Sequence, residues 1–359
     1  MHYFKIKNGD GKEWILPSSN LQTALQIYQP SGWKGKGIKV LLPYLHKISF
    51  IRNFLGLLMC DSPISFELNK QIEDIFRTSK LEYSWFGGTP NTHQKITIQI
   101  FKGKNILGYC KLSKSSKVYA LFEREKEYLV WLAQKGVNHV PNCLYCGKIG
   151  TDEYMFVQTT EKTPHSKAIH DLGNLELSFL SELEQKTKHK LFYENSDQFK
   201  SVARLKSCLN LFQRKEKSVL QFLIEKVEVY YLPNVMYTFA AYHSDFTPWN
   251  MFVEDDKLFV FDFEYAGYSY MPYLDVFHYI FQTAMFEKGW NATMIYDYLQ
   301  KSEEQFGKYF VDFSTALCLY LIDVIGLYAE REQGFIDAQQ KIRLEVADMY
   351  MKSLNMSRY

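Results

Sequence analysis

The sequence lacks the features that mark several common classes of protein. Only six of its 359 residues are cysteines and they are scattered, so the disulfide framework of a small secreted domain is not indicated. The net charge is +2 at neutral pH, which gives no electrostatic case for a nucleic-acid partner. No basic-then-apolar leader opens the chain, and no run approaches the roughly 20 apolar residues of a membrane span. We therefore expect a cytoplasmic protein without a membrane span, and nothing in the sequence points to a protein partner.

What the chain does contain is enough apolar material for more than one core. Its length exceeds that of an ordinary single domain, and 47% of its residues are hydrophobic. Both values suit two lobes plus an extension. Apolar residues at three- and four-residue spacing predict helices within residues 165–235, and the tail from residue 290 to residue 354 is again predicted to be rich in helices.

Residues 241–264 contain the pattern on which the functional interpretation depends. His243, Asp245 and Asn250 have the spacing of a kinase catalytic loop. In such a loop the Asp accepts the proton of the attacking hydroxyl and the Asn binds a magnesium ion. We therefore assign Asp245 as the catalytic base, Asn250 as a metal ligand, and His243 as a residue that orients the loop. The alternative is a polar turn in which Asp245 and Asn250 satisfy backbone donors.

The segment that follows predicts a β-hairpin. Residues 251–253 are apolar, residues 254–257 form a polar tip, and residues 258–261 are apolar again and run into Asp262. Such a hairpin brings Asp262 back beside Asn250. Two oxygen ligands from separate strands then face one cavity, which suits a magnesium ion that bridges nucleotide phosphates. We expect Asp262 to be the principal magnesium ligand.

HSDFTPWN at 243–250 and FDFEYAG at 261–267 resemble the corresponding motifs of the aminoglycoside phosphotransferase and choline kinase-like superfamily. The resemblance implies the α+β, bilobal protein-kinase-like fold, with a small antiparallel β lobe that holds one helix and a larger, mainly helical lobe. These relatives often replace the glycine of the kinase DFG motif, and Glu264 fits that habit. They also carry a further Asp in a helix that braces the catalytic loop, and Asp275 occupies that place.

On this interpretation the chain has three parts. Residues 1–80 would form an extension packed on the first lobe, and residues 81–160 the nucleotide-binding lobe. Residues 161–359 would form the helical lobe with the catalytic loop and the acceptor site.

Residues 81–101 predict two strands around a turn at Gly87, Gly88, Thr89 and Pro90. Exposed backbone amides around Gly87 and Gly88 would bind phosphate oxygens. The alternative is an ordinary hairpin turn with no ligand.

A third strand at residues 106–113 places Lys111 among apolar neighbours, and a helix is expected from Ser116 to Gln134. Glu125 lies within the apolar stripe of that helix, where a carboxylate needs a cation. We expect Lys111 to pair with Glu125 and to contact the nucleotide phosphates, as the strand lysine and helix glutamate of kinases do. The alternative places Glu125 at the edge of the stripe, with Lys111 reaching out to solvent.

Residues 154–162 read as a strand that leads into a polar connection. Their order along the chain matches the adenine-binding hinge of this fold, so backbone groups near Val157 and Gln158 would read the adenine edge.

Together these assignments predict an enzyme that uses ATP and Mg²⁺ to phosphorylate a small-molecule hydroxyl acceptor. The helical segments hold no strong acidic excess, which favours a sugar-like acceptor or a glycan or lipid precursor over a polycationic aminoglycoside. Aminoglycoside, choline and ethanolamine acceptors stay open as alternatives. A non-catalytic nucleotide-binding scaffold is a further alternative. Such scaffolds usually lack the catalytic base, the metal ligands or the lysine, and this sequence has all of them. A protein substrate is disfavoured, because the short interval from Asp262 to Asp275 leaves no room for a long activation segment.

Overall fold

The structure is a computed structural model in which residues 2–8, 11–28, 33–45, 58–88 and 94–356 are described. The chain divides into two compact units, each made of two stretches of sequence. They are residues 1–169 with 249–264, and residues 170–248 with 265–359. The three-part division expected from the sequence stays a prediction.

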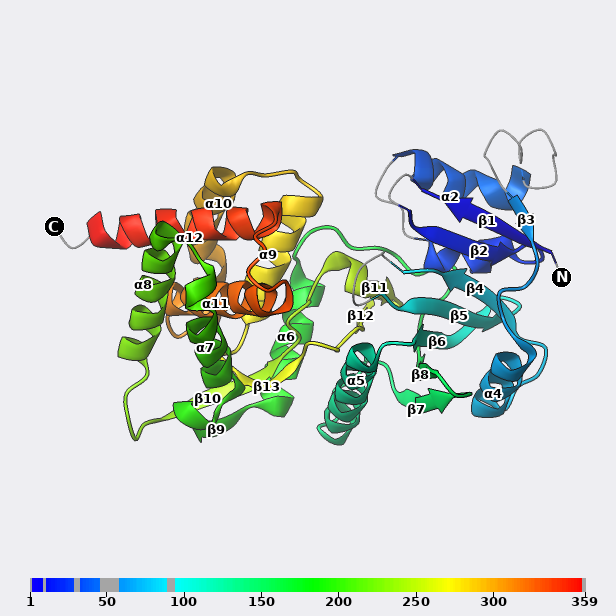
Figure 1. Cartoon of the computed structure of the whole chain (residues 1–359), viewed down its shortest axis with the longest axis horizontal. Helices are drawn as coiled ribbons and strands as arrows, with labels where there is room; N and C mark the ends of the chain where they lie inside the picture. The colour runs from blue at the N-terminus through cyan, green and yellow to red at the C-terminus, as the bar shows by residue number, and fades with distance from the viewer. Residues whose placement is uncertain (1, 9–10, 29–32, 46–57, 89–93, 357–359) are drawn as a thin grey trace. The chain divides into compact units, whose positions relative to one another are not determined.

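Among the described residues, the first unit contains one antiparallel sheet of eight strands in the order β3, β1, β2, β4, β5, β6, β8, β7 (Figure 1). The strands are β1 (Tyr3–Lys7), β2 (Glu13–Pro17), β3 (Leu58–Cys60), β4 (Glu82–Phe86), β5 (Ile96–Lys102), β6 (Asn105–Ser113), β7 (Cys143–Ile149) and β8 (Glu153–Thr159). Because β2 pairs with β4, the N-terminal strands extend the same sheet that carries Lys111.

Alternating apolar residues explain why the central strands form. Ile98 and Ile100 of β5 are fully buried and share one core cluster with Cys110 and Leu112 of β6. The two strands expected within residues 81–101 and the third expected at residues 106–113 are confirmed.

Helices of the first unit accompany this sheet. They are α1 (Leu21–Ala24), α2 (Trp33–Leu45), α4 (Phe66–Phe76) and α5 (Ser116–Gln134). The N-terminus of α4 is capped by the Ser65 hydroxyl, which accepts a hydrogen bond from the Leu68 N–H at 3.2 Å. The bounds of α5 match the helix predicted from its apolar stripe, of which Val118, Phe122 and Leu129 are buried. The unit also contains the hairpin β11 (Met251–Glu254) and β12 (Lys257–Val260).

The second unit is mainly helical, as expected. Its helices are α6 (Asn174–Thr187), α7 (Asp197–Cys208), α8 (Arg214–Tyr230), α9 (Leu274–Phe286), α10 (Ala292–Phe306), α11 (Phe313–Arg331) and α12 (Ala338–Met356). Its strands, in the sheet order β13, β10, β9, are β9 (His189–Phe192), β10 (Met236–Tyr242) and β13 (Gly267–Tyr270). The strand β9 interrupts the stretch 165–235 that the sequence predicted to be helical. The antiparallel sheet and the helical second unit confirm the predicted fold class.

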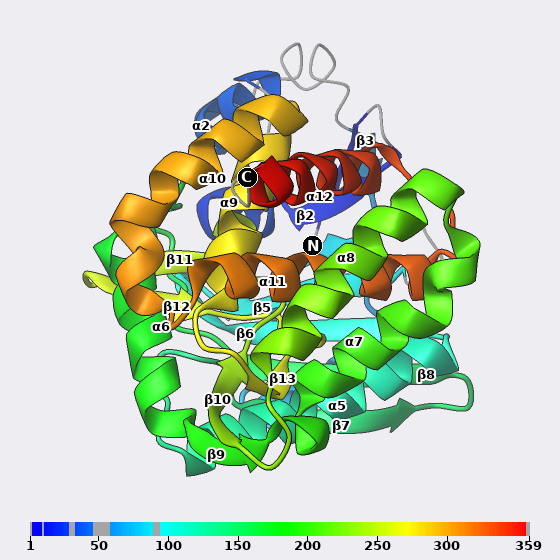
Figure 2. The same ribbon diagram turned by 90° about the vertical axis from the view of Figure 1, so that its left-hand side faces the viewer.

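Within the described residues, one helix is long and apolar enough to cross a membrane by length and composition alone. The 19-residue α11 has a mean hydropathy of 1.4 over its apolar window, but 78% of that window is buried. It packs against α7, α8, α9 and α12 (Figure 2). The apolar composition of α11 is thus accounted for by its place in the core of the second unit.

Candidate active site

The hairpin expected after Asn250 is present in the first unit. β11 pairs with β12, and the Phe261 N–H donates to the Asn250 carbonyl at 3.0 Å. Asn250 and Phe261 therefore stand opposite each other, and Asp262 follows directly. Asn250 is buried, with 5% of its surface exposed. Asp262 has a φ of 71°, a left-handed conformation that costs a non-glycine residue of order 1 kcal/mol and is frequent at functional sites.

Lys111 and Glu125 form the ion pair that the sequence predicted. The Lys111 Nζ lies 2.7 Å from Oε2 and 3.0 Å from Oε1 of Glu125. Lys111 is held in β6, which has β5 and β8 on either side, and Glu125 lies on the buried face of α5. Only 5% of Lys111 and none of Glu125 is exposed, so the alternative in which the lysine reaches solvent is excluded.

Asp262 joins this pair. Its Oδ1 accepts a hydrogen bond from the Lys111 Nζ at 2.6 Å, and the N–H of the next residue, Phe263, donates to Glu125 Oε1 at 3.3 Å. Lys111 therefore bridges the helix carboxylate and the predicted metal ligand. The structure brings together three of the residues to which the sequence gave roles in nucleotide or metal binding.

A second lysine lies at the same place and was not foreseen. The Lys95 Nζ contacts Asp262 Oδ1 at 3.2 Å and Glu264 Oε2 at 2.6 Å. Glu264 had been noted only because it replaces the glycine of the kinase motif. Lys95 directly precedes the predicted strand at residue 96, and nothing local in the sequence distinguishes it from other lysines.

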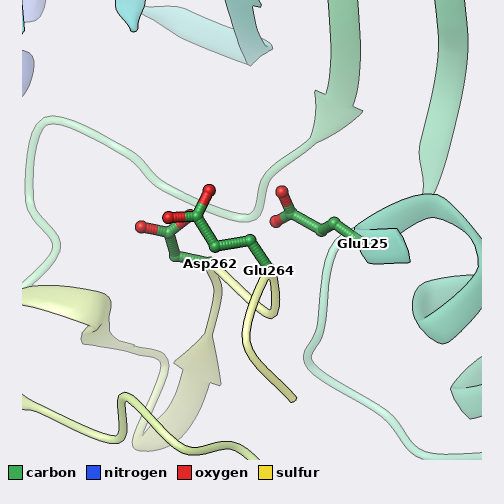
Figure 3. A group of neighbouring side chains, drawn as sticks. All are labelled: Glu125, Asp262 and Glu264. Carbon is green, nitrogen blue, oxygen red and sulfur yellow. The ribbon is translucent and has the colours of Figure 1, made fainter. Parts of the chain in front are cut away.

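The carboxylate of Glu125 points toward those of Asp262 and Glu264, which lie side by side, and one oxygen of each lies within 4.8 Å of the others (Figure 3). Hard oxygen donors of this kind suit Mg²⁺. Three negative charges meet the two positive charges of Lys95 and Lys111, which leaves one negative charge at the site. The residues present therefore fit a divalent cation that arrives with a polyanionic nucleotide.

Burial and the lysines act in opposite directions on this cluster, and burial raises the pKa of Glu125 despite Lys111. Burial lowers the pKa of Lys111, but Asp262 and Glu125 raise it above its ordinary value. Burial also lowers the pKa of Lys95, and Asp262 and Glu264 raise it well above its ordinary value. Burial raises the pKa of Asp262, whereas Lys111 and Lys95 bring it far below its usual range. Asp262 is thus ionised at neutral pH, as a metal ligand must be.

Gly87 and Gly88 are buried, which corrects the expectation of exposed, phosphate-binding amides. The Gly87 N–H donates to the Glu13 carbonyl at 2.9 Å, because β2 extends the sheet beside β4. Gly88 has a φ of 80°, and a Cβ atom there would lie 2.3 Å from the Lys95 carbonyl oxygen. Gly88 therefore allows the chain to pass close to Lys95. Residues 89–90 of the predicted turn lie outside the described residues.

Val157 and Gln158 are also placed differently from the prediction. Both are buried in β8, which is paired with β6 on one side and β7 on the other. Neighbouring strands take up the backbone groups of an inner strand, so these two residues do not present them to a nucleobase. The prediction rested on order along the chain. The backbone leaves the sheet only after Thr159.

In the second unit, Asp275 holds the loop that carries the predicted base. Its Oδ2 accepts a hydrogen bond from the His243 N–H at 2.9 Å, and its Oδ1 accepts one from the Ser244 N–H at 3.0 Å. The Asp245 N–H donates to Nδ1 of His243 at 3.2 Å. Asp275 lies in the first turn of α9 and His243 is fully buried. These contacts are the ones expected if Asp275 braces the loop, as the resemblance implied, and if His243 orients it.

His278 contacts the predicted base and was not foreseen. Its Nε2 lies 3.1 Å from Asp245 Oδ1, and its side chain is 4% exposed whereas that of Asp245 is 34% exposed. His278 follows Asp275 by three positions on α9, which puts both on one helical face. That spacing is the sequence signal from which His278 could have been found.

A small pocket of about 100 Å³ opens beside Asp245 in the second unit. Its lining combines aromatic, apolar and charged side chains: Ser244, Asp245, Tyr265, His278, Asp323, Val324, Leu327, Tyr328 and Arg331. The Arg331 guanidinium lies 4.5 Å from the centre of the Tyr328 ring. Asp323 pairs with Arg204, whose Nη2 is 2.8 Å from its Oδ1.

Comparison with known proteins gives a match over more than half of the chain. Residues 109–309 match the model of the phosphotransferase enzyme family, APH. A search of curated proteins found no match.

Among solved structures, similar folds include a thermostable mutant of aminoglycoside phosphotransferase APH(4)-Ia. Its ternary complex with ADP and hygromycin B aligns with a TM-score of 0.50 at 9% identity, over 80% of this chain and 98% of that chain. The apo form aligns with a TM-score of 0.51 at 9% identity, over 79% and 98% of the two chains. A complex with AMP-PNP and hygromycin B gives 0.51 at 8% identity, over 80% and 99%. At this identity the likeness concerns the fold.

Proposed function

The chain belongs to the phosphotransferase enzyme family, and from this membership we propose that it transfers the γ-phosphate of ATP to a hydroxyl of a sugar-like molecule or a glycan or lipid precursor. As a member it is a phosphotransferase that acts on an alcohol group. The observation that carries the finer proposal is the pocket in which Asp245 lies with Tyr265, Tyr328 and Arg331.

The first unit supplies the nucleotide-binding groups. Lys111, fixed by Glu125 at 2.7 Å, would contact the phosphates of ATP. Asp262 and Asn250 would hold Mg²⁺, which when bound neutralises charge on the β- and γ-phosphates. The net negative charge of the carboxylate cluster in the absence of ligand favours uptake of the cation.

The second unit supplies the base. Asp245 would accept the proton of the acceptor hydroxyl. The oxygen of that hydroxyl forms the new bond to the γ-phosphorus, while the bond between this phosphorus and the bridging oxygen of ADP breaks. The backbone N–H groups bound by Asp275 fix the loop, and His278 fixes the carboxylate. A base that is held in position reduces the entropic cost of reaching the transition state.

The pocket supports a neutral or anionic acceptor rather than a polycation. Arg331 of the lining is paired with Glu332 at 2.8 Å and Asp323 with Arg204 at 2.8 Å, so the pocket holds no strong acidic excess of the kind that a polycation calls for. Tyr265 lines the pocket as an aromatic residue of the kind on which sugar rings pack, with polar groups nearby for the hydroxyls of the sugar, whereas the Tyr328 ring already contacts the guanidinium groups of Arg331 and Arg343. Aminoglycoside, choline and ethanolamine acceptors remain the alternatives, together with a nucleotide-binding scaffold.

An acceptor panel tests the proposal. The purified chain is given ATP and Mg²⁺ with neutral sugars, uronic acids, sugar phosphates, aminoglycosides, choline or ethanolamine, and ADP release is measured. We expect turnover with a sugar-like acceptor and its loss in Asp245→Asn, whereas Asp152→Asn, at an exposed turn in the first unit, should keep it.

Other results would redirect the proposal. Turnover confined to aminoglycosides or to choline would replace the sugar-like acceptor, and nucleotide binding without any turnover would favour the scaffold. Full activity in Asp245→Asn would refute the assignment of the base.

A further inference from the structure

Lys95 lies in the carboxylate cluster of the first unit, and the sequence pattern gave it no role. Its ammonium contacts Asp262 Oδ1 at 3.2 Å and Glu264 Oε2 at 2.6 Å. Lys111 contacts the same Oδ1 at 2.6 Å. Two ammonium groups therefore share one oxygen of the predicted metal ligand, and Glu264 provides a second anchor for Lys95 alone.

Lys95 and Lys111 would keep different anionic partners if Asp262 bound a divalent cation. A divalent cation bound to Asp262 turns the net charge of that group from −1 to +1, so the ammonium groups that contact it are no longer attracted. Lys111 keeps both oxygens of Glu125 as partners, at 2.7 and 3.0 Å. Lys95 keeps only one oxygen of Glu264, at 2.6 Å, so Lys95 is the lysine that has room for a further anionic partner.

The backbone at Lys95 is fixed although its side chain is long. Gln94 Nε2 donates to the Gly87 carbonyl at 2.7 Å, and Gly88 passes so close to the Lys95 carbonyl that a Cβ would be only 2.3 Å away. The start of β5 follows at Ile96. The side chain thus has rotatable bonds with which to move its ammonium by a few ångströms, while its backbone stays in place.

We propose that Lys95 is a second phosphate-binding lysine, which neutralises Asp262 and Glu264 in the absence of ligand and contacts a β- or γ-phosphate oxygen of the nucleotide when Asp262 binds the cation. The inference rests on the proposed function, because it requires a nucleoside triphosphate at this site. Charge-assisted contacts between a lysine and phosphate oxygens are strong enough to replace those with Asp262. Glu264, where the kinase motif has glycine, keeps the ammonium near the phosphates.

Nucleotide binding tests this role without catalysis. Dissociation constants for ATP, ADP and AMP are measured by calorimetry in the presence of Mg²⁺, for the wild type and Lys95→Met. We expect the variant to lose at least about tenfold in affinity for ATP, less for ADP, and under about twofold for AMP, because the lost contact involves the β- or γ-phosphate. Lys102→Met, at an exposed position at the end of β5, should bind all three as the wild type does.

A second variant covers the case in which Lys95→Met does not fold. Glu264→Gln removes the anchor of Lys95 and should weaken binding in the same order, most for ATP and least for AMP. The inference is wrong if a folded Lys95→Met binds ATP within about twofold of the wild type, or if AMP loses as much affinity as ATP. Failure of the wild type to bind any nucleotide would instead overturn the proposed function, and this inference with it.

Discussion

Nε2 of His278 lies 3.1 Å from Oδ1 of Asp245, within the second unit. The buried imidazole holds a carboxylate that is itself one-third exposed and therefore accessible to an acceptor. We expect His278→Ala to lower kcat roughly 10- to 100-fold. This loss is no larger than the smallest effects on rate that follow from removing a residue that itself transfers a proton. The KM for ATP should change by less than about twofold, because no nucleotide-binding group is altered. Steady-state kinetics measure both values.

A conservative variant separates positioning from packing. His278→Gln retains a side-chain N–H that can donate to Asp245 and should recover part of kcat. His165→Ala, at an exposed position in the first unit, is the matched control and should leave kcat unchanged. Equal losses in the Gln and Ala variants would contradict a role through the hydrogen bond.

Asp275 is expected to matter for stability as well as for activity. Asp275→Ala leaves the N–H groups of His243 and Ser244 buried without their acceptor, and each such loss costs about 1–3 kcal/mol. Asp275→Asn keeps one acceptor oxygen and should lose less. Urea unfolding measures the change, and Asp297→Ala on the exposed face of α10 is the control. An unfolding free energy equal to that of the wild type in Asp275→Ala would show that the brace is dispensable.

Local patterns in the sequence were enough to predict much of the fold and part of the site. The alternation of Ile96, Ile98 and Ile100 marks β5, and the apolar stripe around Glu125 marks α5. A carboxylate inside such a stripe requires a cation, which is why the pairing with Lys111 could be predicted. These features depend on residues close together in the chain, where spacing alone determines which side chains share a face.

The features that the sequence did not reveal depend on contacts between distant segments. Lys95 meets Glu264 across 169 positions, and the Gly87 amide is taken by Glu13 from a strand of the N-terminal segment. The hydrophobic periodicity of a sequence does not indicate which strands are neighbours in a sheet.

Glu125 should control both nucleotide affinity and stability. Removing one partner of a buried ion pair costs about 3–5 kcal/mol, and the cost here is reduced because Asp262 still contacts Lys111 at 2.6 Å. We expect Glu125→Gln to lower the unfolding free energy by a few kcal/mol and to weaken ATP binding about tenfold, since Lys111 is no longer fixed. Urea unfolding and calorimetry measure the two effects. Glu127→Gln, exposed on the same helix, is the control.

A double-mutant cycle isolates the pair itself. If Lys111 and Glu125 act together, the loss of ATP affinity in Lys111→Met combined with Glu125→Gln should be smaller than the sum of the two single losses. Additive losses would mean that Glu125 acts on nucleotide binding by a route that does not involve Lys111.

Lys162 gives a prediction about the pH dependence of stability. It is 8% exposed, lies 5.5 Å from the centre of the Phe252 ring, and forms no ion pair within the part of the chain that is described. Burial, with a contribution from Lys39, lowers its pKa from 10.5 to about 7. Between these values the unfolded chain keeps a proton that the folded chain has released, so stability should rise as pH increases from about 7 toward 10.

The variant Lys162→Met removes this group and should change the shape of the stability profile. We expect it to be more stable than the wild type at pH 7 and below, where folding of the wild type buries an unpaired charge, and to gain less on going to pH 10. Each pH unit in the interval contributes at most about 1.4 kcal/mol, so the gain of the wild type is bounded by a few kcal/mol. Urea unfolding between pH 6 and pH 10 measures both profiles, with Lys167→Met at an exposed position as control. Parallel profiles for Lys162→Met and the wild type would show that the ammonium stays hydrated in the folded state.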